Sequence, residues 1–300
     1  MKRGLLVYNP TAGQRDRRAE MNALIDRQRA RGLELVNAPT NGPGDATEIV
    51  KTFLPRGLDV VAVCGGDGTI SEAASGLEGS PVPLAVLPGG TSNVLAIELG
   101  IPADLEHAEA LLHEGKPHGV RMAHADGRPF LMWAGAGLDA RVMGNMSIAW
   151  KRLLGRLGIF PTAVFQFLTY EFPQLEVTVD GVAHEATFAV ACRARHYGGR
   201  WVIAPDARLD ADHFEVLLFS HKSHRKLAQL FTQMASGRAE HLKDGLARIV
   251  RGHEVSMRSL DGPVEVQVDG DSVLQTPIHC RVGRETVHVL VPPGGAAAKD

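Results

Sequence analysis

The first 115 residues alternate short apolar runs with segments of helical periodicity, and this alternation constrains the fold more than any other feature. The apolar runs are GLLVYN (4–9), LELV (33–36), DVVAVC (59–64) and VPLAVL (82–87). The helical segments lie near 16–31, 45–54, 69–77, 92–99 and 104–114. Continuous apolar strands that alternate with helices are typical of a parallel sheet covered on both faces. The sequence therefore predicts a doubly wound α/β domain, which would bind ligands at the carboxyl ends of its strands.

After about Val120 the pattern becomes β-rich. Its strand-like segments are FLMWAG, LEVTVD, ATFAVAC, FEVLLF, VEVQVDG and TVHVLV. Most of them lack the spacing of helical crossovers, which favours an antiparallel sheet or sandwich. Helices are expected only near 145–171 and 223–237. We therefore expect an α/β domain over 1–120, a β-sandwich domain over 121–292, and a frayed tail over 293–300.

Composition and charge are those of a soluble globular protein, with 44% apolar residues and a formal net charge of −2. No global field would draw the chain to nucleic acid, so we expect no nucleic-acid partner. The three cysteines are far apart and are interpreted as buried small hydrophobes in a reduced compartment. The first apolar run is too short for a signal peptide, and Ile159–Phe172 is shorter than a membrane span. A cytoplasmic location is expected.

Gly65–Thr69 follow the third apolar run, precede a helical segment, and contain more glycine than a turn needs. Glycines leave backbone N–H groups open to an approaching oxyanion, and a helix N-terminus favours phosphate. Asp67 would repel phosphate directly, but it suits Mg²⁺ binding or proton acceptance beside a polyphosphate. Glu72, one helical turn later, either assists or only decorates the helix. The alternative interpretation of the junction is a strand–helix turn with a capping aspartate.

Three further turns also lie at the ends of apolar runs. Pro88–Thr91 precede a helix opened by Ser92 or Asn93, Asn9–Gln14 follow the first run, and Thr40 precedes a helix. For the last two, an Asn-Pro turn and a helix cap are the alternatives. Turns at neighbouring strand ends could line one crevice. The chain has no GxxxxGK[ST] motif, so phosphates would be held without the P-loop lysine.

The ordered set of motifs resembles the bacterial diacylglycerol kinase-like lipid kinases, which are related to sphingosine and ceramide kinases and more distantly to NAD kinases. Besides the four turns, the resemblance includes Gly135–Asp139, Pro205–Ala207 and Val268–Asp271, and it covers almost the whole chain. It implies a nucleotide-binding α/β domain, a following β-sandwich domain and an active site between them. The implied co-substrate is ATP, and the implied cofactor is Mg²⁺.

The resemblance also implies roles for individual residues. Asp67 would act near the phosphates and Mg²⁺, and Asp271, after Asp269-Gly270, would accept the proton of the lipid hydroxyl. Asp139 is more readily explained as a structural carboxylate. The expected nucleotide-binding residues are Asn9, Thr40, Gly65, Gly66, Asp67, Gly68, Thr69, Glu72, Gly90, Thr91 and Asn93.

The chain departs from the family pattern at two motifs. Many relatives have Asp-Gly-Glu where this chain has Asp269-Gly270-Asp271, and a shorter side chain changes the reach of the base. Relatives also carry Asp-Asp-Gly in a metal-binding loop of the second domain, where this chain has Asp210-Ala211-Asp212. Either Asp210 or Asp212 binds a structural Mg²⁺ instead, or the turn is metal-free with solvated aspartates.

Other polar and aromatic residues leave two interpretations open. Arg193, Arg195 and His196 either stabilise the transferring phosphate or are ordinary exposed residues. Aromatic residues and a basic edge surround the 145–171 helix, which suits a lid, a membrane-touching element or a helix packed on the sandwich. These residues are Trp133, Trp150, Phe160, Phe165, Phe167 and Phe172, with Lys151, Arg152 and Arg156. The basic cluster His221–Lys226 either contacts anionic headgroups or is a solvated face.

The leading hypothesis is an ATP-dependent lipid kinase that phosphorylates a membrane alcohol such as diacylglycerol. Its expected partners are ATP and a lipid alcohol reached by transient association with the inner membrane, and a homodimer is left open. The first alternative is a kinase of a soluble alcohol, of which NAD kinase is the nearest example. The second is a nucleotide-binding module whose catalysis is impaired, which the changes at Asp271 and Ala211 motivate.

Overall fold

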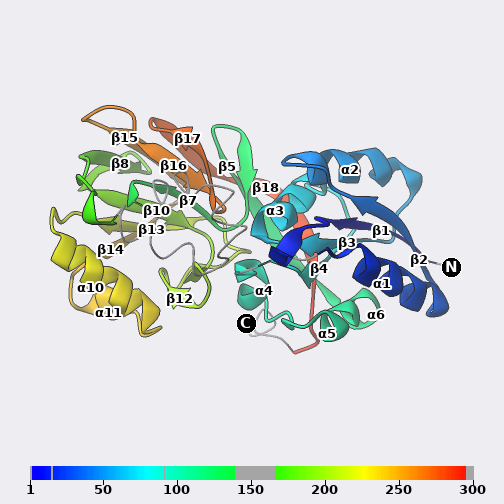
Figure 1. Ribbon diagram of the computed structural model, residues 1–300. Helices are drawn as coiled ribbons and strands as arrows, with labels where there is room; N and C mark the ends of the chain where they lie inside the picture. Colours follow the sequence, from blue (N-terminus) through cyan, green and yellow to red (C-terminus); the bar gives the residue numbers. More distant parts are fainter. Residues whose placement is uncertain (1, 15, 91, 139–166, 295–300) are drawn as a thin grey trace. The chain divides into compact units, whose positions relative to one another are not determined.

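The computed structural model describes residues 2–14, 16–90, 92–138 and 167–294 (Figure 1). It divides into two compact units. Unit 1 consists of Met1–Met122 together with Arg284–Asp300, and unit 2 consists of Ala123–Gly283.

Unit 1 is built on a parallel sheet whose strand order is β2-β1-β3-β4. The four strands are β1 (Lys2–Tyr8), β2 (Leu33–Pro39), β3 (Val60–Gly65) and β4 (Leu84–Pro88). Every residue of β3 and β4 is buried, as expected for central strands covered on both faces. The strand β18 (Ile278–Val291), the last one in the described residues, pairs in parallel with β4 through Val289 and Leu84.

Helices cover both faces of this sheet, so the predicted doubly wound α/β fold is confirmed. In Figure 1, α2 and α3 lie on one face and α1, α5 and α6 on the other. The helices are α1 (Arg18–Ala30), α2 (Asp45–Phe53), α3 (Asp67–Gly76), α4 (Val94–Glu98), α5 (Leu105–Glu109) and α6 (Leu111–Glu114). Two 3₁₀ turns, Ala12–Gln14 and Leu54–Arg56, complete the connections. The single helix predicted near 104–114 is therefore two short helices.

Unit 2 contains an antiparallel six-stranded sheet in the order β14-β13-β10-β7-β16-β17. Its strands are β7 (Trp133–Ala136), β10 (Phe188–Cys192), β13 (Phe214–Phe219), β14 (Arg248–Gly252), β16 (Glu265–Val268) and β17 (Asp271–Gln275). A small hairpin pairs β11 (His196–Tyr197) with β12 (Trp201–Val202). Two helices, α10 (His224–Ala235) and α11 (Glu240–Lys243), precede β14.

A second antiparallel layer packs on this sheet. There β15 (Glu254–Ser259) pairs with β18 and β8 (Leu175–Val179), and β8 pairs with β9 (Val182–Ala186). The end of β5 (Lys116–Ala125) pairs with β6 (Arg128–Phe130). Buried side chains from both layers form one core, in which the ring centroids of Phe130 and Phe214 are 6.1 Å apart. The predicted antiparallel sandwich is confirmed.

Two boundaries differ from the sequence prediction. The second domain was expected to end at residue 292, but Arg284–Asp300 group with unit 1, because the end of β18 pairs beside β4. The run FLMWAG was expected to be one strand, but β6 ends at Phe130 and β7 begins at Trp133. Most of the helix expected near 145–171, and the end of the expected tail, lie outside the described residues.

All three cysteines are buried and form no disulfide with one another, in agreement with the prediction that they are core residues. Burial raises the pKa of the Cys280 thiol to about 12. None of the helices in the described ranges has the length and apolar character needed to cross a bilayer.

Candidate nucleotide-binding and catalytic site

The predicted nucleotide-binding turns of unit 1 lie side by side at one edge of its sheet. Tyr8, the last residue of β1, is in register with Pro39 of β2 and with Cys64 of β3. Gly65, which ends β3, is in register with Pro88 of β4. Because parallel strands end at the same edge, the residues that follow them are neighbours. These are Asn9, Thr40, Gly66 and Gly89.

The two glycine turns pack directly against each other through their backbones. Gly89 donates its N–H to the carbonyl oxygen of Gly65 at 3.0 Å. A Cβ on Gly90 would overlap the Cα of Gly66, and a Cβ on Gly89 would lie 3.0 Å from the Cys64 sulfur. The glycines are therefore needed for a close approach of two main chains, and the resulting surface consists of backbone atoms.

Replacing Gly90 by alanine is expected to destabilise unit 1 by about 1–3 kcal/mol, as overpacking in a tight site does. A Cβ at this position would overlap the Cα of Gly66, and backbone cannot move aside as a flexible side chain can. Thermal unfolding of the purified variant checks the expectation. Gly42→Ala is the matched control, because nothing lies within 4 Å of its added Cβ. Equal unfolding temperatures for the two variants would contradict the packing described here.

Asp67 and Asn93 hold the starts of two helices at this edge. Asp67 is the first residue of α3, and its Oδ1 accepts the N–H of Leu95 in α4 at 3.2 Å. The N-cap residue of α3 is Gly66, which has no side chain to accept a hydrogen bond. Asn93, in the left-handed region at φ 48°, exchanges side-chain hydrogen bonds with the N–H and carbonyl of Gly90 at 2.9 and 3.0 Å. Both side chains thus fix the loops around the glycine turns.

Glu72 lies one turn further along α3 and contacts the neighbouring helix. Its carboxylate accepts the N–H groups of Gly44 at 2.7 Å and Ala46 at 3.3 Å, at the start of α2. A carboxylate at a helix N-terminus stabilises that helix through the orphan amides and the macrodipole. The structure therefore gives Glu72 a capping function, and its predicted contact with nucleotide stays a prediction.

Asn9 and Thr40 complete the edge. Asn9 donates its N–H to the carbonyl of Cys64 at 3.0 Å, and its side-chain oxygen accepts from Thr11, as in an Asx turn. Thr40 is buried and donates its N–H to the carbonyl of Tyr8 at 2.8 Å. Thr91, the remaining predicted contact, lies outside the described residues, as does Asp139.

Arg17 is a buried residue of this edge that the sequence analysis missed. Its Nε donates to the carbonyl of Ala12 at 2.9 Å, and its Nη2 donates to the carbonyl of Gly89 at 2.8 Å. Glu20 pairs with its Nη1 at 2.8 Å. Arg17 therefore connects the turn after β1 with the turn after β4. Nothing in the local sequence distinguishes it from Arg15 and Arg18.

In unit 2, the predicted catalytic motif is a two-residue hairpin turn between β16 and β17. Asp269 and Gly270 both have positive φ, 48° and 91°, which is the conformation that Asp-Gly favours in such turns. Asp271 is the first residue of β17 and is in register with Val268. The turn thus places Asp271 at a defined backbone position.

Buried hydrogen bonds fix this turn. The Asp269 carboxylate accepts the N–H groups of Leu131, Met132 and Trp133 at 2.7, 2.8 and 3.0 Å. Gln267 is buried and accepts the N–H of Gly270 at 2.7 Å. These amides explain the break between β6 and β7, since they are turned toward Asp269 instead of a neighbouring strand. Asp269 is therefore a structural carboxylate.

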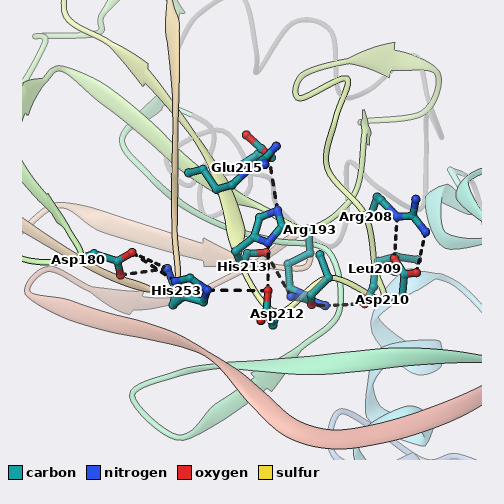
Figure 2. Close-up of polar contacts among 11 residues, drawn as sticks. Asp180, Arg193, Arg208, Leu209, Asp210, Asp212, His213, Glu215 and His253 are labelled. Atoms are coloured by element: carbon teal, nitrogen blue, oxygen red, sulfur yellow. Dashed lines mark hydrogen bonds and ion pairs between the residues drawn. The ribbon is translucent and has the colours of Figure 1, made fainter.

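The predicted metal-binding turn of unit 2 has no suitable set of donors. The Asp210 carboxylate is held by Arg208 at 2.8 and 3.0 Å, and Asp212 contacts His213 at 3.1 Å (Figure 2). The hydrogen bond from His213 lowers the pKa of the Asp212 carboxyl. Within the described ranges, no group of three or more His, Cys, Asp or Glu residues is placed to hold a metal ion. The residues present do not fit a structural Mg²⁺.

Arg193, one of the residues that the sequence offers for phosphate stabilisation, has a fully buried side chain. Its guanidinium donates to backbone carbonyls of the 208–213 turn, so it is not placed to meet a substrate. Arg195 is exposed, and the backbone carbonyl of His196 accepts the indole N–H of Trp133 at 3.0 Å.

Comparisons with known proteins agree with this fold and with these motifs. The family model described as "Diacylglycerol kinase catalytic domain" matches residues 3–125. The family model described as "YegS C-terminal NAD kinase beta sandwich-like domain" matches residues 133–291, which is more than half of the chain.

Relatives match over nearly the full length of the chain. A diacylglycerol kinase of Bacillus subtilis (strain 168) is 25% identical, and the alignment covers 100% of both chains. A diacylglycerol kinase of Staphylococcus aureus (strain bovine RF122 / ET3-1) is 26% identical over 90% of this chain and 86% of its own. A crystal structure of a candidate diacylglycerol kinase from Bacillus anthracis is 25% identical, with a TM-score of 0.78 and coverage of 98% and 96%.

The glycine turns on a parallel sheet, joined to an antiparallel sandwich, are those of a kinase with an NAD kinase-like fold. More particularly, the chain belongs to the bacterial diacylglycerol kinase-like lipid kinase family. A kinase of this family uses ATP. The family resemblance identified in the sequence is confirmed.

Proposed function

We propose that this kinase transfers the γ-phosphate of ATP to the hydroxyl of a membrane lipid alcohol such as diacylglycerol. The observation that carries the proposal is the backbone-to-backbone packing of Gly66 and Gly90 at the ends of adjacent parallel strands. A surface made of main-chain atoms beside a helix N-terminus is suited to polyphosphate. The names of the relatives support a lipid as the acceptor.

The chain's own groups would hold the nucleotide in two ways. The first-turn N–H groups of α3 have no acceptor four residues earlier in the helix, so they can donate to phosphate oxygens. Asp67, at the start of the same helix, provides the type of ligand that Mg²⁺ takes from a protein when phosphates and water supply the others. Bound Mg²⁺ would neutralise charge on the triphosphate.

Asp271 is proposed as the acceptor of the hydroxyl proton. An alcohol loses its proton readily only when a base is within hydrogen-bond reach. Of the two carboxylates in the turn, Asp269 already accepts three amide N–H groups, so it is occupied by the fold. Asp271, which follows at the start of β17, is the remaining carboxylate.

The experiment is phosphate transfer from γ-labelled ATP, with Mg²⁺, into mixed micelles of defined acceptors. Separate micelles contain diacylglycerol, ceramide or a sphingoid base, and a detergent-free reaction contains NAD as a soluble acceptor. We expect labelled phosphatidic acid from diacylglycerol. Label in NADP alone would replace the proposal by the soluble-alcohol alternative. ATP binding without any labelled product, also after Asp271→Glu, would support the impaired nucleotide-binding module.

A further inference from the structure

The turn between β12 and β13, residues 208–213, surrounds a buried guanidinium; we call it the 208–213 loop. Nη2 of Arg193 donates to the carbonyl oxygens of Leu209 and Ala211, the latter at 3.0 Å. Nη1 donates to the carbonyl oxygen of His213 at 3.5 Å. Figure 2 shows Arg193 beside this loop. Three carbonyl oxygens of one loop therefore meet a single positive charge.

The charge is fixed in place and permanent. Arg193 follows β10, and its backbone N–H donates to the carbonyl of Met132 at 2.8 Å. Its side chain is fully buried, and a buried charge is tolerated only when it is hydrogen-bonded. An arginine remains protonated in proteins, so the guanidinium cannot relieve its burial by losing a proton. The loop carbonyls accept hydrogen bonds from both Nη1 and Nη2 of this guanidinium.

The two carboxylates of the loop also contact basic side chains of the protein, namely an arginine and two histidines. Asp210 accepts two hydrogen bonds from Arg208, and Asp212 lies 3.8 Å from Nε2 of His253 in addition to its contact with His213 (Figure 2). Mg²⁺ demands near-octahedral oxygen ligation. A divalent ion in this loop would compete for the same oxygens and would be repelled by the guanidinium.

We propose that Arg193 replaces a structural divalent cation in unit 2. Its guanidinium gathers the carbonyl oxygens of the 208–213 loop, so the sandwich needs no metal, and the family's middle aspartate is dispensable at Ala211. The proposal goes beyond the proposed function, because it concerns how unit 2 is stabilised and not the transfer reaction. Any requirement for Mg²⁺ in turnover then comes from the nucleotide alone.

The first test is thermal unfolding of the wild-type protein without nucleotide, in EDTA, in MgCl₂ and in MnCl₂. We expect the same Tm in all three buffers, within about the precision of the method. Calorimetric titration of the Asp67→Asn variant with MnCl₂ accompanies it, because that variant lacks the carboxylate proposed to hold the nucleotide's metal. We expect no stoichiometric binding. A Tm that falls in EDTA and returns with Mg²⁺, or one Mn²⁺ bound per chain, would overturn the proposal.

The second test changes the guanidinium itself. Arg193→Met is expected to lower the Tm by roughly 5–15 °C, since buried carbonyl oxygens lose their donors. Arg195→Met, two residues away at an exposed position, is the matched control and should change the Tm little. The double variant Arg193→Met/Ala211→Asp should regain Tm when Mg²⁺ is added. If Arg193→Met is as stable as the control, the guanidinium does not hold the loop. If a variant does not fold, the wild-type measurements still decide.

Discussion

The Asp67→Asn variant is expected to lose activity by roughly 10²-fold or more in kcat while keeping its fold. Asparagine retains the side-chain oxygen that accepts the N–H of Leu95 at 3.2 Å, so the connection between α3 and α4 is preserved. What it removes is the negative charge proposed to bind Mg²⁺ beside the phosphates. Initial rates at saturating ATP and lipid, with circular dichroism for the fold, measure the two effects separately.

The control for this substitution is Asp26→Asn, an exposed aspartate on α1 whose partner is Arg29 at 3.4 Å. It makes the same chemical change on the surface of the same unit, and we expect wild-type rates from it. Turnover of Asp67→Asn close to that of Asp26→Asn would show that the Asp67 charge has no part in catalysis. Asp67→Ala would then report only the structural contact to Leu95.

The second large effect is expected for Asp271→Asn, which should reduce kcat by about 10²–10⁴-fold, the usual contribution of a general base. The amide is of the same size but cannot accept the hydroxyl proton. The hairpin itself should survive, because its fixed points are the carboxylate of Asp269 and the amide oxygen of Gln267. The measurement is the pH dependence of kcat together with the Tm.

Asp271→Glu separates the need for a carboxylate from the need for its position. The family pattern has glutamate here, so this variant should stay well above Asp271→Asn in rate. Asp244→Asn, at an exposed position of the same unit, is the surface control. Equal rates for Asp271→Asn and Asp244→Asn would exclude Asp271 as the base. A slow Asp271→Glu with a fast wild type would show that this chain has adapted to the shorter side chain.

The parallel sheet of unit 1 could be predicted because its strands carry a strong local signal. A strand such as β3 is apolar along its length, since both faces are buried, and its end is followed at once by Gly65 and Gly66. The alignment of the strand ends then follows from the fold class, because the carboxyl ends of parallel strands lie at the same edge of the sheet. The close approach of Gly66 to Gly90 is a consequence that the two glycine pairs already indicate.

The break in FLMWAG could not be predicted from its own residues. Leu131 and Met132 are apolar and suit a strand, but their N–H groups bind a carboxylate 138 and 137 residues later in the chain. The Asp-Gly pair that supplies this carboxylate is itself a strong hairpin signal. This signal is present in VEVQVDG, where the sequence analysis assigns a catalytic motif and no hairpin turn.

The burial of two arginines, Arg17 and Arg193, also could not be predicted from the sequence. Arg17 and Arg193 have neighbours of the same type, and which arginine turns inward is decided by carbonyl oxygens that distant segments present. Glu72 is similar, because its partners belong to another helix. Local periodicity contains no information on such contacts, since burial of a charge depends on its partners and not on its own preference.

The sheet of unit 1 is completed late in synthesis, because the end of β18 follows unit 2 in the chain. The end of β18, which pairs with β4 through Val289, is synthesised after unit 2, so the flank of β4 beside Leu84 emerges from the ribosome long before this neighbour exists. An unpaired strand edge is a template for aggregation while it is exposed. The nascent chain must therefore carry an unfinished sheet through the translation of all of unit 2, and a prematurely terminated chain would never complete it.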